Sequence, residues 1–211
     1  MSGPRIDSYD WPGGREPMLR FGPATGPTVA LALPLFEEAN RTRAFGVAIL
    51  RALAEHGVVG LLPELPGQGE SLLPTSDATL ANIRAAFADI GASFAITIRG
   101  GCLLPSHLPT WMLSPQSGAD LLRELARIKA APLIGDPVEI AGNLLSQTLL
   151  AELAPAEPPP GRVVRLTSDP QPADRHIAGQ PLWRRAEPGD DVALAQALAA
   201  DIAEWIRTCA A

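Results

Sequence analysis

The chain has 211 residues, of which 46% are hydrophobic, and its 17 basic and 23 acidic side chains give a formal net charge of −6. A chain of this size buries a substantial core without disulfide bonds, so we expect a single domain spanning residues 1–211. The acidic balance, with no basic block, argues against a general nucleic-acid-binding function. No apolar run approaches the length of a membrane span and no signal-peptide pattern opens the chain, so we expect a cytoplasmic protein.

The first predicted elements are an arm, a strand, a helix and a second strand. Residues 1–27 are expected to form an N-terminal arm or a small antiparallel hairpin. Thr28–Pro34 is a continuous apolar run, typical of a strand covered on both faces. Asn40 is a candidate cap for the helix that follows, and Gly57 is its expected stop. Val58–Leu65 is predicted to be the next strand.

The rest of the chain continues the alternation of strands and helices. The predicted elements are a helix from Leu80 to Ile90, strands at Phe94–Ile98 and Thr110–Ser114, a helix from Leu121 to Ile128, a short helix over Leu144–Leu153, a proline-rich joint at 154–160, a strand at Arg162–Ser168, a strand stub near His176–Ala178 and a helix over Val192–Ile206. This alternation predicts a doubly wound, mostly parallel α/β sheet. No phosphate-binding glycine motif and no metal-like cysteine or histidine spacing is present, so we expect no cofactor and no metal.

Five short motifs, in collinear order, resemble a known family. Residues 63–71, PELPGQGES, are similar to the glycine loop after the second parallel strand of α/β hydrolases. Residues 34–43, PLFEEANRTR, are similar to the P-P-F-x-E-E-x-N-[RK]-x-R stretch of the exosortase A system-associated hydrolases of bacteria that export polysaccharide. Further matches fall at 110–131, 138–153 and 179–188. The chain therefore resembles a shortened, type 2-like member of this family within the α/β-hydrolase superfamily, without a large cap domain.

The resemblance draws attention to the bend after the strand Phe94–Ile98. Active α/β hydrolases carry G-x-S-x-G at this bend, with the serine as nucleophile. The matching residues here are Thr97, Ile98, Arg99, Gly100 and Gly101. A guanidinium is permanently protonated and cannot attack a carbonyl carbon. The link to the next strand is too short for a full crossover helix, so we expect that helix to shrink to a turn or two.

The other members of a catalytic triad are only partly present. Asp169 follows the strand after which the family carries its acid. The expected position of the base falls at residues 180–182, which contain no histidine, and His176 lies a few residues too early.

Two other groups are candidates for a non-standard nucleophile. Cys102 lies close enough to Arg99 for the cation to favour a thiolate, although a small buried side chain is the more ordinary interpretation. Ser106 beside His107 supplies the right residue types, but a surface turn is the simpler interpretation.

A charged side chain at a buried strand end needs partners, because the loss of its hydration costs on the order of several kcal/mol. Glu37, Glu38, Glu64 and Asp169 all follow strands at the carboxyl edge of the predicted sheet. We predict that Arg99 pairs with Glu37 or Glu38, with Asp169 as second choice, and forms a structural lock. The alternative is a pocket for a carboxylate or phosphate. The residues assigned to this pocket are Arg99, Gly100, Gly101, Glu37, Glu38 and Asn40.

The leading hypothesis is a catalytically degenerate α/β-hydrolase-like accessory or binding protein, and the resemblance implies a setting in exopolysaccharide or protein-sorting systems. Expected partners are a hydrolase paralogue or a second copy of the chain, and a small anionic ligand. The alternative is a small esterase, thioesterase or acyltransferase with a non-standard nucleophile. Trp111, Trp183 and Trp205 are candidates for a sugar-stacking platform, although core packing is their more ordinary role.

Overall fold

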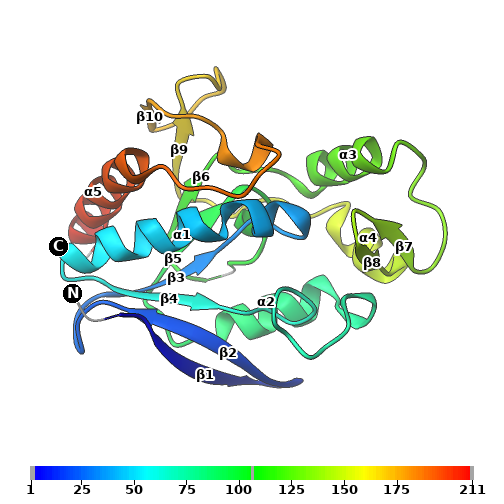
Figure 1. Cartoon of the computed structure of the whole chain (residues 1–211), viewed down its shortest axis with the longest axis horizontal. Coiled ribbons are helices and arrows are strands. Elements are labelled where there is room, and N and C mark those ends of the chain that lie inside the picture. The colour runs from blue at the N-terminus through cyan, green and yellow to red at the C-terminus, as the bar shows by residue number, and fades with distance from the viewer. Residues whose placement is uncertain (1–2, 106, 210–211) are drawn as a thin grey trace.

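An eight-stranded sheet forms the centre of the computed structural model, which describes residues 3–105 and 107–209 (Figure 1). The strand order is β1-β2-β4-β3-β5-β6-β9-β10. From β4 to β10 in this order, each pair of neighbouring strands is parallel. The β1–β2 and β2–β4 pairs are antiparallel. The bounds are β1 Arg5–Trp11, β2 Gly14–Phe21, β3 Thr28–Ala32, β4 Val59–Pro63, β5 Phe94–Ile98, β6 Thr110–Leu113, β9 Arg162–Leu166 and β10 Arg175–Ile177.

Helices cover both faces of the sheet. They are α1 Glu37–Glu55, α2 Leu80–Ala88, α3 Gly118–Lys129, α4 Gln147–Leu153 and α5 Val192–Cys209, with short 3₁₀ segments η1 Thr75–Asp77, η2 Arg99–Leu103 and η3 Leu182–Arg184. Helices α1 and α5 lie side by side and share one apolar core, whereas α2, α3 and α4 contribute to the core on the other face (Figure 1). Because both faces are covered, the central strands are almost entirely buried and read as continuous apolar runs.

The predicted doubly wound, mostly parallel sheet is confirmed, and so is the N-terminal hairpin. Strands β1 and β2 form that hairpin, and β2 joins it to the sheet by pairing with β4. The described residues contain no large inserted cap. Between β6 and β9 lie only α3, a small hairpin and α4. Within the described part of the chain, no helix is both long and apolar enough to cross a membrane.

The small hairpin was not predicted from the sequence. It consists of β7 (Val138–Ile140) and β8 (Asn143–Leu145), joined by a turn in which Ala141 and Gly142 both have positive φ, at 48° and 82°. Helix α4 therefore begins at Gln147, later than the expected start at Leu144. Three-residue strands carry too little alternation to be separated from a short helix by periodicity.

The expected cap of α1 is wrong. The helix begins at Glu37 and its N-cap is Phe36, so Asn40 lies inside the helix with an exposed side chain. The two acidic residues Glu37 and Glu38 instead occupy the first turn, where they suit the positive end of the helix dipole. This earlier start is what brings Glu38 to the carboxyl edge of the sheet.

Candidate functional site

The bend after β5 keeps a strained backbone even though it carries no nucleophile. Arg99 has φ of 53°, in the left-handed region that L-residues with a Cβ rarely adopt. Arg99 begins the 3₁₀ segment η2, which is the only helical segment in the described part of the link to β6. The expected shortening of the crossover helix to a turn or two is therefore confirmed. Gly101 packs so closely that an added Cβ would overlap the carbonyl oxygens of Ala32 and Leu33. The bend is therefore wedged against the end of β3.

Two carboxylates hold the guanidinium of Arg99. Its Nη2 lies 3.2 Å from Oε1 of Glu38 and 2.6 Å from Oε2 of Glu124, and its Nε donates to Oε2 of Glu38 at 3.3 Å. The guanidinium also lies 5.4 Å from the centroid of the Trp183 ring. Glu38 is thus confirmed as a partner, whereas Glu37 pairs with Arg41 on its own helix. We call Arg99, Glu38 and Glu124 the ion-pair lock.

Burial sets the electrostatics of the ion-pair lock. Burial lowers the pKa of Arg99, but the Glu38 and Glu124 carboxylates raise it by more, so the pKa lies above its usual value. Burial raises the pKa of Glu38, and Arg99 only partly offsets that rise. Glu38 therefore depends on the cation for its charge.

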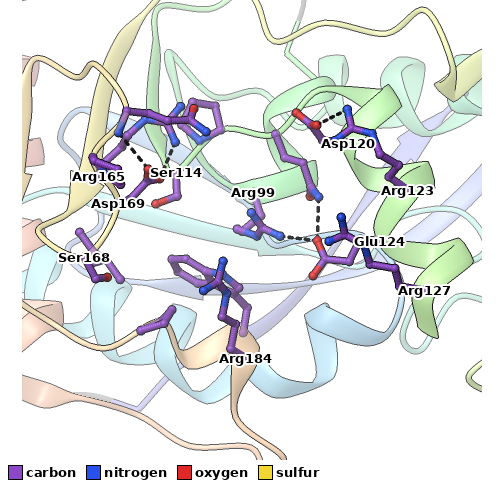
Figure 2. A pocket seen from close by; sticks show the side chains of 17 residues that line it. Arg99, Ser114, Asp120, Arg123, Glu124, Arg127, Arg165, Ser168, Asp169 and Arg184 are labelled. Carbon is purple, nitrogen blue, oxygen red and sulfur yellow. Dashed lines mark hydrogen bonds and ion pairs between the residues drawn. The ribbon is translucent and has the colours of Figure 1, made fainter.

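A cavity of about 390 Å³ opens beside Arg99 at the carboxyl edge of the sheet. Figure 2 shows Arg165 and Asp169 on one side of Arg99, and Glu124 and Arg127 on the other. The walls come from the ends of β6 and β9, from one face of α3 and from the η3 segment. Five arginines line the cavity: Arg99, Arg123, Arg127, Arg165 and Arg184. Three carboxylates accompany them, namely Asp120, Glu124 and Asp169.

Two buried polar side chains in the cavity wall have no partner for one of their atoms. Ser114 is 3% exposed, and its Oγ has no hydrogen-bond partner among the described residues. Gln116 is 5% exposed and donates from Nε2 to Oε2 of Glu124 at 2.8 Å, while its Oε1 has no partner in the described chain. Buried polar atoms are usually paired, so these two indicate a missing hydrogen-bonding group.

Asp169 and His176 do not form the acid–base pair of a triad. Asp169 lines the cavity and pairs with Arg165, with Nη1 2.6 Å from Oδ2. Burial raises the pKa of Asp169, but hydrogen bonds from Arg165 and from the backbone of Gln171 outweigh it, so the pKa lies below its usual value. His176 is exposed on β10, and its Nε2 lies 3.1 Å from the backbone oxygens of Asp169 and Gln171. It is not a wall residue of the cavity.

The structure favours the core interpretation of Cys102. Its side chain is fully buried, and burial raises the pKa of its thiol to about 12 despite the nearby charge of Arg99. The Thr97 hydroxyl donates to its Sγ at 3.1 Å. A thiol in this state is neither ionised nor accessible at neutral pH. Ser106 lies outside the described residues.

Other predicted pocket residues lie away from the cavity. Gly100 and Gly101 are buried behind the bend, and Asn40 borders a separate small cavity beside Glu64. Glu64 pairs with Arg43 of α1, which leaves it unavailable to Arg99. Of the six residues assigned to the pocket, all of which the structure describes, only Arg99 lines the main cavity.

The tryptophans do not form a shared platform. Trp111 is fully buried, and its Nε1 donates to Asp201 at 2.8 Å. Trp205 packs edge-on against Phe94, with ring centroids 5.6 Å apart. Only Trp183 reaches the cavity, where Arg99 covers it. The sugar-stacking interpretation is therefore wrong for the group as a whole.

One backbone donor in the loop between β3 and α1 is already occupied. In active members of this fold, the loop between β3 and the first helix supplies an N–H to the oxyanion of the reaction intermediate. Here the N–H of Phe36, in the corresponding loop, donates to Oε1 of Gln68 at 3.2 Å.

Within residues 3–105 and 107–209, no group of three or more metal-binding side chains is arranged to hold an ion.

Comparison with known structures supports the fold. A protein from Agrobacterium vitis S4 that is named as a hydrolase superposes with a TM-score of 0.52 and 15% identity over 77% of each chain. Epoxide hydrolase A of Mycobacterium thermoresistibile gives a TM-score of 0.44 and 23% identity, and covers 53% of this chain and 39% of its own. Potato epoxide hydrolase I gives a TM-score of 0.43 and 16% identity, and the match covers 53% of this chain and 40% of the potato enzyme.

The chain spans about 40% of the length of these epoxide hydrolases. No protein-family profile and no curated protein sequence matches it significantly. At such low identities the likeness concerns the fold alone. The protein is α/β-hydrolase-like in fold, and its function has to be argued from the site.

Proposed function

We propose that this protein is a catalytically degenerate α/β-hydrolase-like protein that acts by binding and not by turnover. Arg99 carries the proposal, because a permanently charged side chain occupies the left-handed bend where this fold presents its nucleophile. Glu38 and Glu124 hold that side chain in place. A residue in a strained backbone conformation persists only where the surrounding structure holds it in place. Here the side chain at the strained position forms an ion pair and does not supply an attacking oxygen.

Two further features support the absence of turnover. The Phe36 N–H, which would otherwise be free to stabilise an oxyanion, is taken by Gln68. No histidine is among the described residues that line the cavity, so no imidazole base lies beside a hydroxyl there. At the described bend, attack therefore lacks a nucleophile. The described cavity wall offers no imidazole for proton transfer, and one donor for an oxyanion is already taken.

The motif resemblance supplies the proposed setting. We place the protein in the cytoplasm as an accessory to an exosortase-type, polysaccharide-exporting system. An active hydrolase paralogue or a second copy of the chain is its proposed partner. Glu38, from the most specific of the matching motifs, is the residue that the ion-pair lock uses. Size-exclusion chromatography with light scattering tests self-association, and a monomer alone at tens of micromolar would contradict that version.

Activity-based labelling tests the proposal directly. The protein is incubated with p-nitrophenyl acetate, p-nitrophenyl butyrate and a fluorophosphonate probe, and adducts are located by mass spectrometry. We expect hydrolysis no faster than in buffer and no stoichiometric adduct.

Ser114 is the residue at which an adduct would contradict the proposal. Its hydroxyl has no partner among the described residues and lies in the cavity wall, and its backbone has φ of 47°. A stoichiometric adduct on Ser114, with turnover that disappears in Ser114→Ala, would overturn the proposal. The protein would then be a small esterase, thioesterase or acyltransferase.

A further inference from the structure

The cavity beside Arg99 carries more positive than negative charge. Five arginines and three carboxylates line it, and Glu38, which touches Arg99 from α1, adds a fourth carboxylate. Arg99 is neutralised by the ion-pair lock, and Arg123 pairs with Asp120.

Arg127 and Arg184 have no ion-pair partner in the described part of the chain, and they lie on different walls of the cavity, from α3 and η3 (Figure 2). Arg165 donates from Nη1 to Oδ2 of Asp169 and from Nε to the carbonyl oxygen of Pro172. A guanidinium has five N–H donors, so Arg165 keeps donors beyond these two bonds. The free positive charge of the cavity is therefore carried by Arg127 and Arg184 and not by Arg99. Arg165, which lies on the other side of Arg99 from Arg127, adds spare N–H donors (Figure 2).

The unpartnered atoms of Ser114 and Gln116 indicate what a ligand has to supply besides negative charge. The amide orientation of Gln116 is set by Glu124, because a carboxylate only accepts hydrogen bonds and so takes the Nε2 side of the amide. The Oε1 of Gln116 then needs a donor from elsewhere. The Oγ of Ser114 can donate or accept. Both atoms are buried in the wall, where an unmet hydrogen bond is destabilising.

We propose that this cavity binds a small organic anion that also carries hydroxyl groups. Arg127 and Arg184 hold the carboxylate or phosphate, and Arg165 donates to the ligand from the other side of Arg99. A hydroxyl of the ligand donates to Oε1 of Gln116 and exchanges a hydrogen bond with Ser114, after a small rotation of these two buried side chains. The volume of about 390 Å³ suits a molecule at the small end of the usual range, which runs from about 300 to 1,000 Å³. This inference rests on the proposed binding function and adds the ligand class.

The chemistry of the wall distinguishes this ligand from simpler ones. An unsubstituted carboxylate satisfies the arginines but offers no donor to Gln116. A neutral sugar offers donors but leaves Arg127 and Arg184 without a counter-charge. Each ligand lacking one feature forgoes about one good hydrogen-bonding interaction, which corresponds to about tenfold in affinity.

Isothermal titration calorimetry with four probes tests the inference at neutral pH and low salt. D-gluconate and D-glucose 6-phosphate carry both features, hexanoate carries only the charge, and D-glucose carries only the hydroxyls. We expect at least one of the first two to bind about tenfold more tightly than hexanoate and glucose. The gluconate and glucose 6-phosphate arms tell a carboxylate site from a phosphate site. Added salt should weaken this binding, because Arg127 and Arg184 are exposed.

Variants locate the site. Arg127→Met and Arg184→Met alter exposed side chains and should each reduce binding about tenfold, while Arg207→Met removes an exposed charge on α5, away from the cavity, and should leave binding unchanged. Ser114→Ala should bring the affinity for the hydroxylated anion toward that for hexanoate.

Absence of binding by both hydroxylated anions at millimolar concentration would overturn the inference, as would equal binding of glucose or indifference to Arg127→Met and Arg184→Met. These outcomes are separate from those of ester hydrolysis and probe labelling. Turnover defeats the proposed function, whereas an inactive protein that ignores the probes defeats only the ligand class.

Discussion

Replacing Arg99 by methionine leaves two carboxylates facing a place where a cation stood. Methionine keeps a Cβ, so the backbone strain at φ of 53° is the same in both proteins. The substitution therefore reports on the charge. Its partner substitution is Glu38→Leu, made alone and together with Arg99→Met, because Glu38 is 8% exposed and is the more deeply buried of the two carboxylates.

The expected loss of stability in Arg99→Met follows from the distances between the charged atoms and from their burial. Two unit charges 3.2 Å apart attract by about 5 kcal/mol at an effective dielectric constant of about 20, and desolvation offsets much of this. Breaking a buried pair by removing one member costs about 3–5 kcal/mol. We take the lower end, about 3 kcal/mol, because the Glu124 side chain is 34% exposed and its share is screened. Replacing both charges with apolar side chains is often nearly neutral, so the double variant should recover about 2 kcal/mol.

Urea denaturation followed by circular dichroism measures the free energies of unfolding, and thermal melts should show a fall of about 6–12 °C for Arg99→Met. Without the cation, burial raises the pKa of Glu38 further above its value in the unfolded chain. The deficit of Arg99→Met should therefore be larger at pH 8 than at pH 5, where protonation relieves it. A loss below about 1 kcal/mol, or a double variant less stable than Arg99→Met, would refute the reasoning.

Three other features lead to predictions. Burial raises the pKa of Asp201, but hydrogen bonds from two arginines and an indole outweigh it and lower the pKa to about 2. The stabilisation it provides, about 2 kcal/mol, is thus present above about pH 4 and is lost as the pH falls toward 2, and Asp201→Asn should remove this dependence in urea titrations. Gly101→Ala should cost about 3 kcal/mol because its Cβ overlaps two carbonyl oxygens, whereas at Gly100 the nearest atom would be 3.4 Å away and alanine should be tolerated. Iodoacetamide should label exposed Cys209 and spare buried Cys102 until the protein is unfolded.

Each of these predictions has an outcome that contradicts it. Equal acid sensitivity of the wild type and Asp201→Asn would show that the ordinary carboxyls control acid unfolding. Equal stability of Gly100→Ala and Gly101→Ala would mean that β3 moves away from the bend without cost. Labelling of Cys102 in the folded protein at the rate of Cys209 would mean that its surroundings open readily.

Local patterns explain why most of the architecture is readable from the sequence. Short apolar runs such as Phe94–Ile98 can be satisfied only when both faces of a strand are covered, and the observed strand has the predicted bounds. The brevity of the link after Arg99 likewise excludes a full crossover helix, whatever the rest of the chain does. By contrast, the β7–β8 hairpin depends on a two-residue turn at Ala141 and Gly142, and its strands are too short for periodicity to detect.

The contents of the site were less predictable. Glu124 lies 25 residues beyond Arg99, and nothing in the pattern of α3 indicates that its acidic side chain turns toward the bend. Cys102 is near Arg99 in sequence, yet its side chain points into the core and not toward the cavity. Neighbours along a chain diverge at a tight bend, whereas residues brought there by different helices converge.

The sequence by itself determined that the chain forms a mostly parallel α/β sheet with a cation at the bend where this fold usually carries a nucleophile. The sheet follows from local apolar periodicity, whereas the place of the cation at that bend follows from the motif resemblance and from the chemistry of one residue. Only the tertiary structure decided that Glu38 and Glu124 hold that cation, and that Ser114, Gln116, Arg127 and Arg184 meet around a neighbouring cavity. The reason is that a partner and a cavity are defined by how separate elements pack, and that packing is set by the whole core.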